Sequence, residues 1–183
     1  MKKWAIFLSG RGSNAEAFWE NLAEFDVRLC VSSTAKAYGV LRARRLGIPT
    51  CVLEKKPNWE QLDQELRQRQ VNQIFLLGFM KIVPAHFVKK WQGQIWNLHP
   101  SLLPDFPGLQ AIEKSYAAGG AMGVSLHQVT QEMDAGPLSL QHKICDETGE
   151  FLSIDEAAFR ISRAEQRLVR ELAQRKNLEM RWN

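Results

Sequence analysis

An amide and an imidazole stand two positions apart in segment 94–108, at the end of a short apolar run. Residues 95–98 are typical of a buried strand, and on a strand Asn97 and His99 point to the same face. Pro100 then ends the strand, because proline has no N–H for the next hydrogen bond. An amide N–H and an imidazolium N–H are suitable donors to a developing oxyanion. The pair therefore indicates a catalytic site; a buried pair satisfied by backbone groups is the alternative.

A glycine-rich turn, Gly-Arg-Gly-Ser-Asn-Ala at residues 10–15, follows the first apolar run and fits the loose G-x-G-x-x-A pattern. Its glycines let backbone N–H groups approach an anion, and the following helix N-terminus adds a favourable field, so the turn predicts phosphate binding. A dinucleotide would require an acidic residue at the end of the second strand, but Ser32 and Ser33 follow Val31. An NAD(P)-dependent oxidoreductase and an ordinary strand-to-helix turn remain the alternatives.

Composition sets the broad class of protein. With 183 residues and 45% hydrophobic content the chain can form one core, so we expect a single domain over 1–183. Three scattered cysteines indicate a reducing compartment and show no metal-binding spacing, which favours the cytoplasm. No apolar run approaches the roughly 20 residues that span a bilayer, so no membrane association is expected. The net charge of +4 favours small anionic ligands, whereas the absence of a dense basic run argues against nucleic acid.

Strand and helix patterns alternate along the chain. Strands are expected at residues 4–8, 27–31, 51–53, 74–77, 95–98, 124–129 and 138–144. Helices are expected at residues 14–23, 38–46, 58–70, 84–90, 109–118 and 153–174, with Asn14 capping the first and Ser153 the last. This alternation predicts an α/β, doubly wound, mostly parallel sheet. Ligands then bind at the carboxyl ends of the strands, so the turns after Leu8, Leu77 and Leu98 should meet at one crevice.

The run Asn-Leu-His-Pro-Ser-Leu-Leu-Pro at 97–104, followed by Phe-Pro-Gly at 106–108, resembles the signature of the folate-dependent formyltransferases. The resemblance extends from about residue 10 to residue 172 and implies a Rossmann-like fold of that family. It also implies transfer of a formyl group from 10-formyltetrahydrofolate to a primary amine, with hydrogen-bond donors rather than a metal in the Lewis-acid role. Within the family the chain is most similar to members that formylate glycinamide ribonucleotide in purine synthesis. An amino sugar nucleotide is an alternative acceptor, and the sequence leaves a monomer or a homodimer open.

The resemblance also implies roles for individual residues. Asn97, His99 and Asp134 correspond to the catalytic set, with Asp134 favouring protonated His99 and holding a proton-relay water. The presence of all three argues against a non-enzymatic relative with a decayed site. The substrate phosphate is expected at Gly12, Ser13 and Asn14, and the ribose or amine at Glu165. Folate is expected at Met80, Lys81, Ile82, Val83, Gln131, Glu132 and Met133.

Some positions depart from the family pattern or carry two interpretations. Trp59 and Lys81 stand where arginine is usual, and Ala135 stands where glycine is common. These departures bear on the identity of the acceptor more than on the chemistry. His127 is placed near the folate site by the resemblance, and a satisfied core histidine is the alternative.

Overall fold

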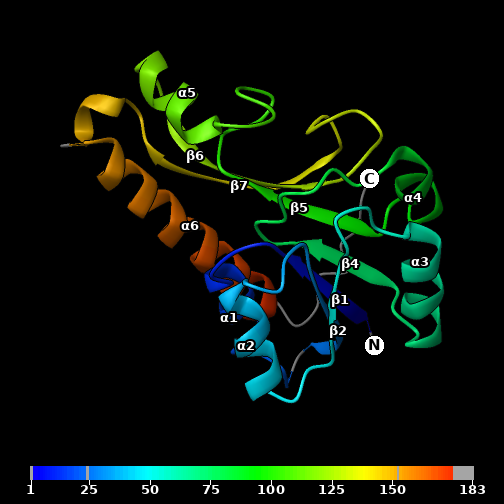
Figure 1. The fold of residues 1–183 in the computed structure, drawn as a ribbon. Helices are drawn as coiled ribbons and strands as arrows, with labels where there is room; N and C mark the ends of the chain where they lie inside the picture. Colours follow the sequence, from blue (N-terminus) through cyan, green and yellow to red (C-terminus); the bar gives the residue numbers. More distant parts are fainter. Residues whose placement is uncertain (1, 24, 152, 175–183) are drawn as a thin grey trace.

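The structure, a computed structural model, describes residues 2–23, 25–151 and 153–174, and one twisted sheet runs through it (Figure 1). Its seven strands are β1 (Lys3–Leu8), β2 (Asp26–Ser32), β3 (Thr50–Val52), β4 (Gln73–Leu76), β5 (Ile95–His99), β6 (Met122–Gln128) and β7 (Leu138–Cys145). Their order across the sheet is β3-β2-β1-β4-β5-β6-β7. The first five pair in parallel, while β5 with β6 and β6 with β7 pair antiparallel. The predicted, mostly parallel α/β sheet is thus confirmed.

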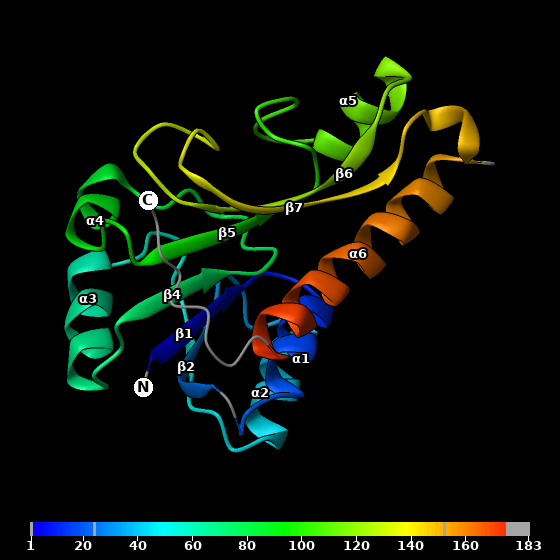
Figure 2. The same ribbon diagram turned by 180° about the vertical axis from the view of Figure 1, so that it is seen from behind.

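Helices cover both faces of this sheet, as Figures 1 and 2 show from opposite sides. One face packs against α1 (Ser13–Trp19), α2 (Tyr38–Arg45), α5 (Ala111–Ala118) and the long α6 (Ile154–Gln174). The other face packs against α3 (Trp59–Gln68) and α4 (Ala85–Lys90). Two apolar clusters result, because alternate side chains of the central strands enter opposite layers. This double cover explains why β1 and β4 read as continuous apolar runs.

The helix starts are partly those that the sequence indicates. Asn58 caps α3 by accepting the backbone N–H of Gln61 at 3.1 Å, and Ser153 accepts that of Glu156 at 3.2 Å. The expected cap at Asn14 is wrong. Gly12 occupies that position with φ 74°, no side chain caps α1, and Asn14 lies within the first turn of the helix.

The physical reason is a close approach of two helices. A Cβ atom on Gly12 would lie 2.7 Å from the Cα of Gly39, at the start of α2, so only glycine fits. Asn14 meanwhile donates from Nδ2 to Oε2 of Glu165 at 2.9 Å, a partner distant in the sequence. The helix also ends at Trp19 instead of residue 23. Among the helices that the structure describes, none is long and apolar enough to cross a membrane.

Candidate active site

The strand order reverses between β1 and β4, which is where ligands bind in sheets of this kind. The turns that follow these strands are in direct contact. Ser9, after β1, accepts the backbone N–H of Met80 at 2.8 Å, and the hydroxyl of Ser33, after β2, donates to Ser9 at 2.6 Å. The carboxyl ends of three strands are therefore tied together, as the sequence predicts for the first two turns.

Asn97, His99 and Asp134 lie together at the end of β5. Asn97 donates from Nδ2 to Oδ1 of Asp134 at 3.3 Å, and Nδ1 of His99 lies 3.5 Å from the other carboxylate oxygen, Oδ2. Asp134 belongs to the loop between β6 and β7, which begins after Gln128, the partner of Trp96 on β5. The convergence expected from the strand-end geometry is present, with one carboxylate placed between an amide and an imidazole.

The carboxylate of Asp134 is held in its charged form. Burial by itself raises its pKa, but the hydrogen bond from His127, the backbone N–H of Gly108 at 2.8 Å and the neighbouring charge of His99 outweigh burial. The resulting pKa is about 2, so Asp134 is ionised throughout the neutral range. Its backbone φ of 51° is uncommon for a residue other than glycine and is tolerated best by Asp and Asn. Strain of this kind is typical of functional sites.

His127 is part of the same cluster, although the sequence gives it no assigned role there. It is 1% exposed, and its Nδ1 donates to the carbonyl oxygen of Gln128 at 2.8 Å. Its Nε2 lies 3.1 Å from Nδ2 of Asn97 and 3.4 Å from Oδ1 of Asp134. It therefore accepts from the amide when neutral and donates to the carboxylate when protonated. The sequence does not reveal this position, because it depends on the register of β5 and β6, which pairs Asn97 with His127.

The imidazole of His99 is oriented by a backbone carbonyl. Its Nε2 lies 3.0 Å from the carbonyl oxygen of Phe106, which accepts only, so Nε2 carries a hydrogen. Nδ1 is then the nitrogen that faces Asp134. A proton gained by the ring resides on Nδ1, where an oxyanion and the carboxylate can both reach it.

The predicted phosphate turn and the predicted ribose-binding residue are brought together. Asn14, in the first turn of α1, and Glu165, in the middle of α6, are hydrogen-bonded. The Oδ1 atom of Asn14 is buried and has no protein partner among the described residues. The backbone N–H groups of Ser13 and Asn14 lie at the start of α1, so this corner combines donors for an anion with a carboxylate.

Glu165 is expected to make stability depend on pH. Burial raises its pKa to about 7, and the hydrogen bond from Asn14 offsets only part of this effect. Because the folded pKa exceeds the unfolded value, the stability contribution is complete at low pH and is lost as pH rises through about 7. The difference in free energy of unfolding between Glu165→Gln and wild type should therefore shift by about 1–3 kcal/mol in favour of the variant from pH 5 to pH 8. Urea denaturation at both pH values measures this, with Glu171→Gln on the same helix as the control; an equal difference at both values contradicts it.

Three of the residues expected to bind folate are large apolar side chains with high exposure. Met80, Ile82 and Met133 are 69%, 79% and 60% exposed, which is unusual for large apolar side chains. The sulfur of Met133 would lie 3.4 Å from a Cβ atom on Gly108, beside the N–H that binds Asp134. Val83 is partly buried against the core cluster of α3 and α4. The remaining expected residues, Lys81, Gln131 and Glu132, belong to the same two loops.

Two positions that depart from the family pattern have structural roles. Trp59 stacks obliquely on Phe87 with ring centroids 5.1 Å apart and joins the apolar layer of α3 and α4. Lys81 donates from Nζ to the carbonyl oxygen of Lys55 at 3.1 Å, so it ties the loop after β4 to the loop before α3. Within the described part of the chain, no group of three or more His, Cys, Asp or Glu side chains is arranged to hold a metal ion.

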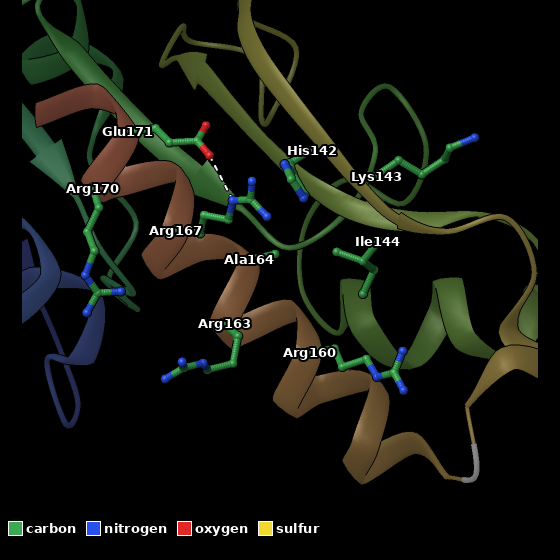
Figure 3. A pocket seen from close by; sticks show the side chains of 9 residues that line it. All are labelled: His142, Lys143, Ile144, Arg160, Arg163, Ala164, Arg167, Arg170 and Glu171. Atoms are coloured by element: carbon green, nitrogen blue, oxygen red, sulfur yellow. Dashed lines mark hydrogen bonds and ion pairs between the residues drawn. The ribbon is translucent and has the colours of Figure 1, made fainter. Parts of the chain in front are cut away.

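A hollow of about 740 Å³ lies between β7 and α6 (Figure 3). It is lined by His142, Lys143, Ile144, Arg160, Arg163, Ala164, Arg167, Arg170 and Glu171. Most of its cations are already paired: Arg160 with Glu156, Arg167 with Glu171, Arg170 with Glu20 and Lys143 with Asp146. In Figure 3 the imidazole of His142 points toward α6.

This hollow and the catalytic cluster lie on opposite faces of the sheet. On β7, His142 pairs with Val124, which belongs to the core on the α6 face. The adjacent Gln141 pairs with Ser125 and points to the other face, toward the loop that follows His99. Neighbouring strand residues point in opposite directions, so the hollow is separate from the cluster around Asp134. Because most cations of the hollow are paired, we take the cluster around Asp134 as the candidate for catalysis.

The chain is also similar to known proteins. The family model described as formyl transferase matches residues 2–169, nearly the whole chain. This chain therefore belongs to the formyl transferase family.

Some relatives are of similar length to this chain and others are much longer. Phosphoribosylglycinamide formyltransferase of Bacillus subtilis is 36% identical over 155 residues, which cover 79% of this chain and 80% of that protein. The trifunctional purine biosynthetic protein adenosine-3 of Gallus gallus is 35% identical, but this chain spans only 17% of it. The crystal structure of phosphoribosylglycinamide formyltransferase from Anaplasma phagocytophilum superposes with a TM-score of 0.86 at 37% identity, covering 94% of this chain and 86% of that one.

Proposed function

We propose that this protein transfers a formyl group from 10-formyltetrahydrofolate to the primary amine of glycinamide ribonucleotide, a step of purine synthesis. The observation that carries the proposal is the cluster in which Asp134 contacts both Asn97 and His99 at the end of β5. Similarity to phosphoribosylglycinamide formyltransferases over most of the chain supports the choice of acceptor. The proposal treats residues 1–183 as one formyltransferase domain that acts on small molecules in the cytoplasm.

In the proposed reaction the neutral amine of the acceptor attacks the formyl carbon, and negative charge develops on the formyl oxygen. Protonated His99 donates to that oxygen from Nδ1, and Asn97 donates from Nδ2. In the ligand-free protein the Nδ2 group of Asn97 faces His127 at 3.1 Å and Asp134 at 3.3 Å. One of these contacts must be exchanged for the oxyanion, and the longer one to Asp134 is the weaker.

Bond formation leaves a proton on the attacking nitrogen, and the departing nitrogen of the folate must gain one. We assign to Asp134, which is ionised at neutral pH, the role of holding a water molecule that carries this proton. Collapse of the tetrahedral adduct then breaks the bond between the formyl carbon and the folate nitrogen. The products are the formylated amine and tetrahydrofolate, and no redox change or further reactant is required.

The two substrates are assigned to residues outside this cluster. We assign the acceptor phosphate to the N–H groups of Gly12, Ser13 and Asn14, and the ribose or amine to Glu165. We assign the folate to Met80, Lys81, Ile82, Val83, Gln131, Glu132 and Met133, in the loops that follow β4 and β6. The fit is chemical: an aromatic, partly apolar ring system covers large exposed side chains such as Met80 and Ile82.

The experiment that tests this function is a formyl-transfer assay with a panel of amine acceptors. With 10-formyltetrahydrofolate, we expect turnover with glycinamide ribonucleotide and much lower turnover with an amino sugar nucleotide. Turnover only with the sugar nucleotide would replace the acceptor and retain the chemistry. No transfer to any acceptor, under conditions where a known family member is active, would refute the proposal.

Ligand binding separates this function from an oxidoreductase. A non-reactive tetrahydrofolate analogue at 100 times its Kd should stabilise the fold by about 2.7 kcal/mol through mass action, which raises the melting temperature. NAD and NADP should both leave it unchanged, because the proposed enzyme uses no dinucleotide. For NAD, Ser32 and Ser33 also offer no carboxylate to the ribose at the end of β2. Scanning calorimetry with each ligand measures both effects. A shift with NADP and none with the folate analogue would favour the oxidoreductase.

A further inference from the structure

A closed set of hydrogen bonds fixes the loop that follows His99. The hydroxyl of Ser125, which is fully buried on β6, donates to the carbonyl oxygen of Ser101 at 2.6 Å. It accepts the backbone N–H of Leu103 at 3.0 Å and one hydrogen of Nε2 of Gln141 at 2.9 Å. The other hydrogen of Gln141 goes to the carbonyl oxygen of Leu103 at 2.7 Å. Both amide hydrogens and all three hydrogen-bonding positions of the hydroxyl are therefore used.

The same loop carries the carbonyl group that orients His99. The hydroxyl of Ser101 donates to the carbonyl oxygen of Asp105 at 2.6 Å. The next residue, Phe106, has φ 54°, an uncommon conformation for a bulky side chain, and its carbonyl oxygen accepts from Nε2 of His99 at 3.0 Å. The direction of that carbonyl group consequently depends on the loop being held in place from Ser101 onward.

We propose that Gln141 is a positioning residue: through residues 101–106 it holds the carbonyl oxygen of Phe106 where it fixes the ring orientation and tautomer of His99. The catalytic meaning of this inference rests on the proposed formyl transfer. A neutral imidazole has one N–H, and its bond to Phe106 keeps that hydrogen on Nε2. Nδ1 is then left to face Asp134 at 3.5 Å, so it alone receives the proton that is offered to the oxyanion.

The role requires a donor pair that few side chains supply. The two oxygens contacted by Gln141 come from Leu103 and Ser125, and each receives an N–H. Gln141→Leu keeps much of the volume and removes both donors, whereas Gln141→Glu keeps the shape and presents an acceptor to a carbonyl oxygen. Gln141 is an exposed residue at the edge of the sheet, so both variants are expected to fold. Gln64→Leu, at an exposed position of α3, is the matched control.

The first measurement is nitrogen NMR of the ligand-free protein, with the His99 signals identified from a His99→Gln variant. Wild type and Gln64→Leu should carry the hydrogen of neutral His99 on Nε2. Gln141→Leu and Gln141→Glu should show a mixture of both tautomers. An unchanged tautomer in both Gln141 variants would overturn the proposal, whether or not turnover falls, because any loss would then be a general structural effect. This arm needs no substrate, so it stands even if no formyl transfer is found.

The second measurement is steady-state kinetics across pH. In Gln141→Leu we expect kcat to fall about 10–100-fold, the scale of a small misplacement of a catalytic group. KM for both substrates should stay within about two-fold, because His99 acts on charge that develops in the transition state. The Gln141→Leu, Ser125→Ala double variant should lose little more than Gln141→Leu alone, since both belong to one network. Full turnover in Gln141→Leu, or strictly additive losses in the double variant, would also overturn the proposal.

Discussion

Asn97→Ala is expected to lower kcat by about 10²–10³-fold, the cost of removing one preorganised donor to an oxyanion. KM for folate and for the acceptor should change little, because the lost hydrogen bond strengthens only as charge develops on the formyl oxygen. Steady-state kinetics with both substrates measures the two parameters separately. The position of Asn97, on the same side of β5 as His99 and in contact with Asp134, is the basis of the expectation.

A control is required, since Asn97 also contacts His127 in the ligand-free protein. Asn21→Ala removes another partly buried amide, one that donates to the carbonyl oxygen of Ala17 at 3.2 Å. It should leave kcat unaffected, and the melting temperatures of both variants show whether the fold is retained. Near-normal turnover in Asn97→Ala would refute the role of Asn97 as an oxyanion donor, even if the protein is an active formyltransferase.

The second large effect is expected at Asp134. Asp134→Asn keeps the shape of the side chain and removes the charge that favours protonated His99, so turnover should fall by about 10²-fold or more. Steady-state kinetics with both substrates measures the loss. Turnover close to that of the wild type would contradict the electrostatic role.

The backbone at Asp134 makes the choice of variant important. With φ at 51°, Asn is tolerated nearly as well as Asp, whereas Ala adds strain. Comparing Asp134→Asn with Asp134→Ala therefore separates the loss of charge from a displaced loop. Asp134→Asn is expected to melt at a different temperature from the wild type, because it loses the stability that the ionised carboxylate provides. Above pH 4 the wild type gains stability from its low pKa of about 2, and this gain disappears only as pH falls toward that value.

The sequence predicts the helices and strands because their formation depends mainly on residues that are close together along the chain. The apolar runs at residues 74–77 and 95–98 correspond to β4 and β5, since buried parallel strands read as continuous apolar segments. Gly119 ends α5 with φ 78°, as a glycine after an apolar helix indicates. The alternation of these segments is enough to predict helices on both faces of one sheet.

Contacts between segments that are distant in the sequence could be identified only in the tertiary structure. Asn14 looks like a helix cap, but its amide is used by Glu165, and the cap position needs a glycine because α2 lies against it. The sequence allows two interpretations of His127, and only the register of β5 with β6 places it against Asn97 and Asp134. The pKa values near 2 for Asp134 and near 7 for Glu165 likewise depend on burial and on partners brought in by folding.

The sequence by itself determined the kind of fold and the set of polar groups at the ends of its strands. Those properties follow from side-chain periodicity, turn residues and a short motif, which operate over a few residues. Tertiary structure alone decided which of these groups touch. Examples are the four groups that contact the two oxygens of Asp134, and the network from Gln141 to the carbonyl group beside His99. Strand register and loop geometry set such contacts, because a shift of one residue would turn each side chain to the opposite face.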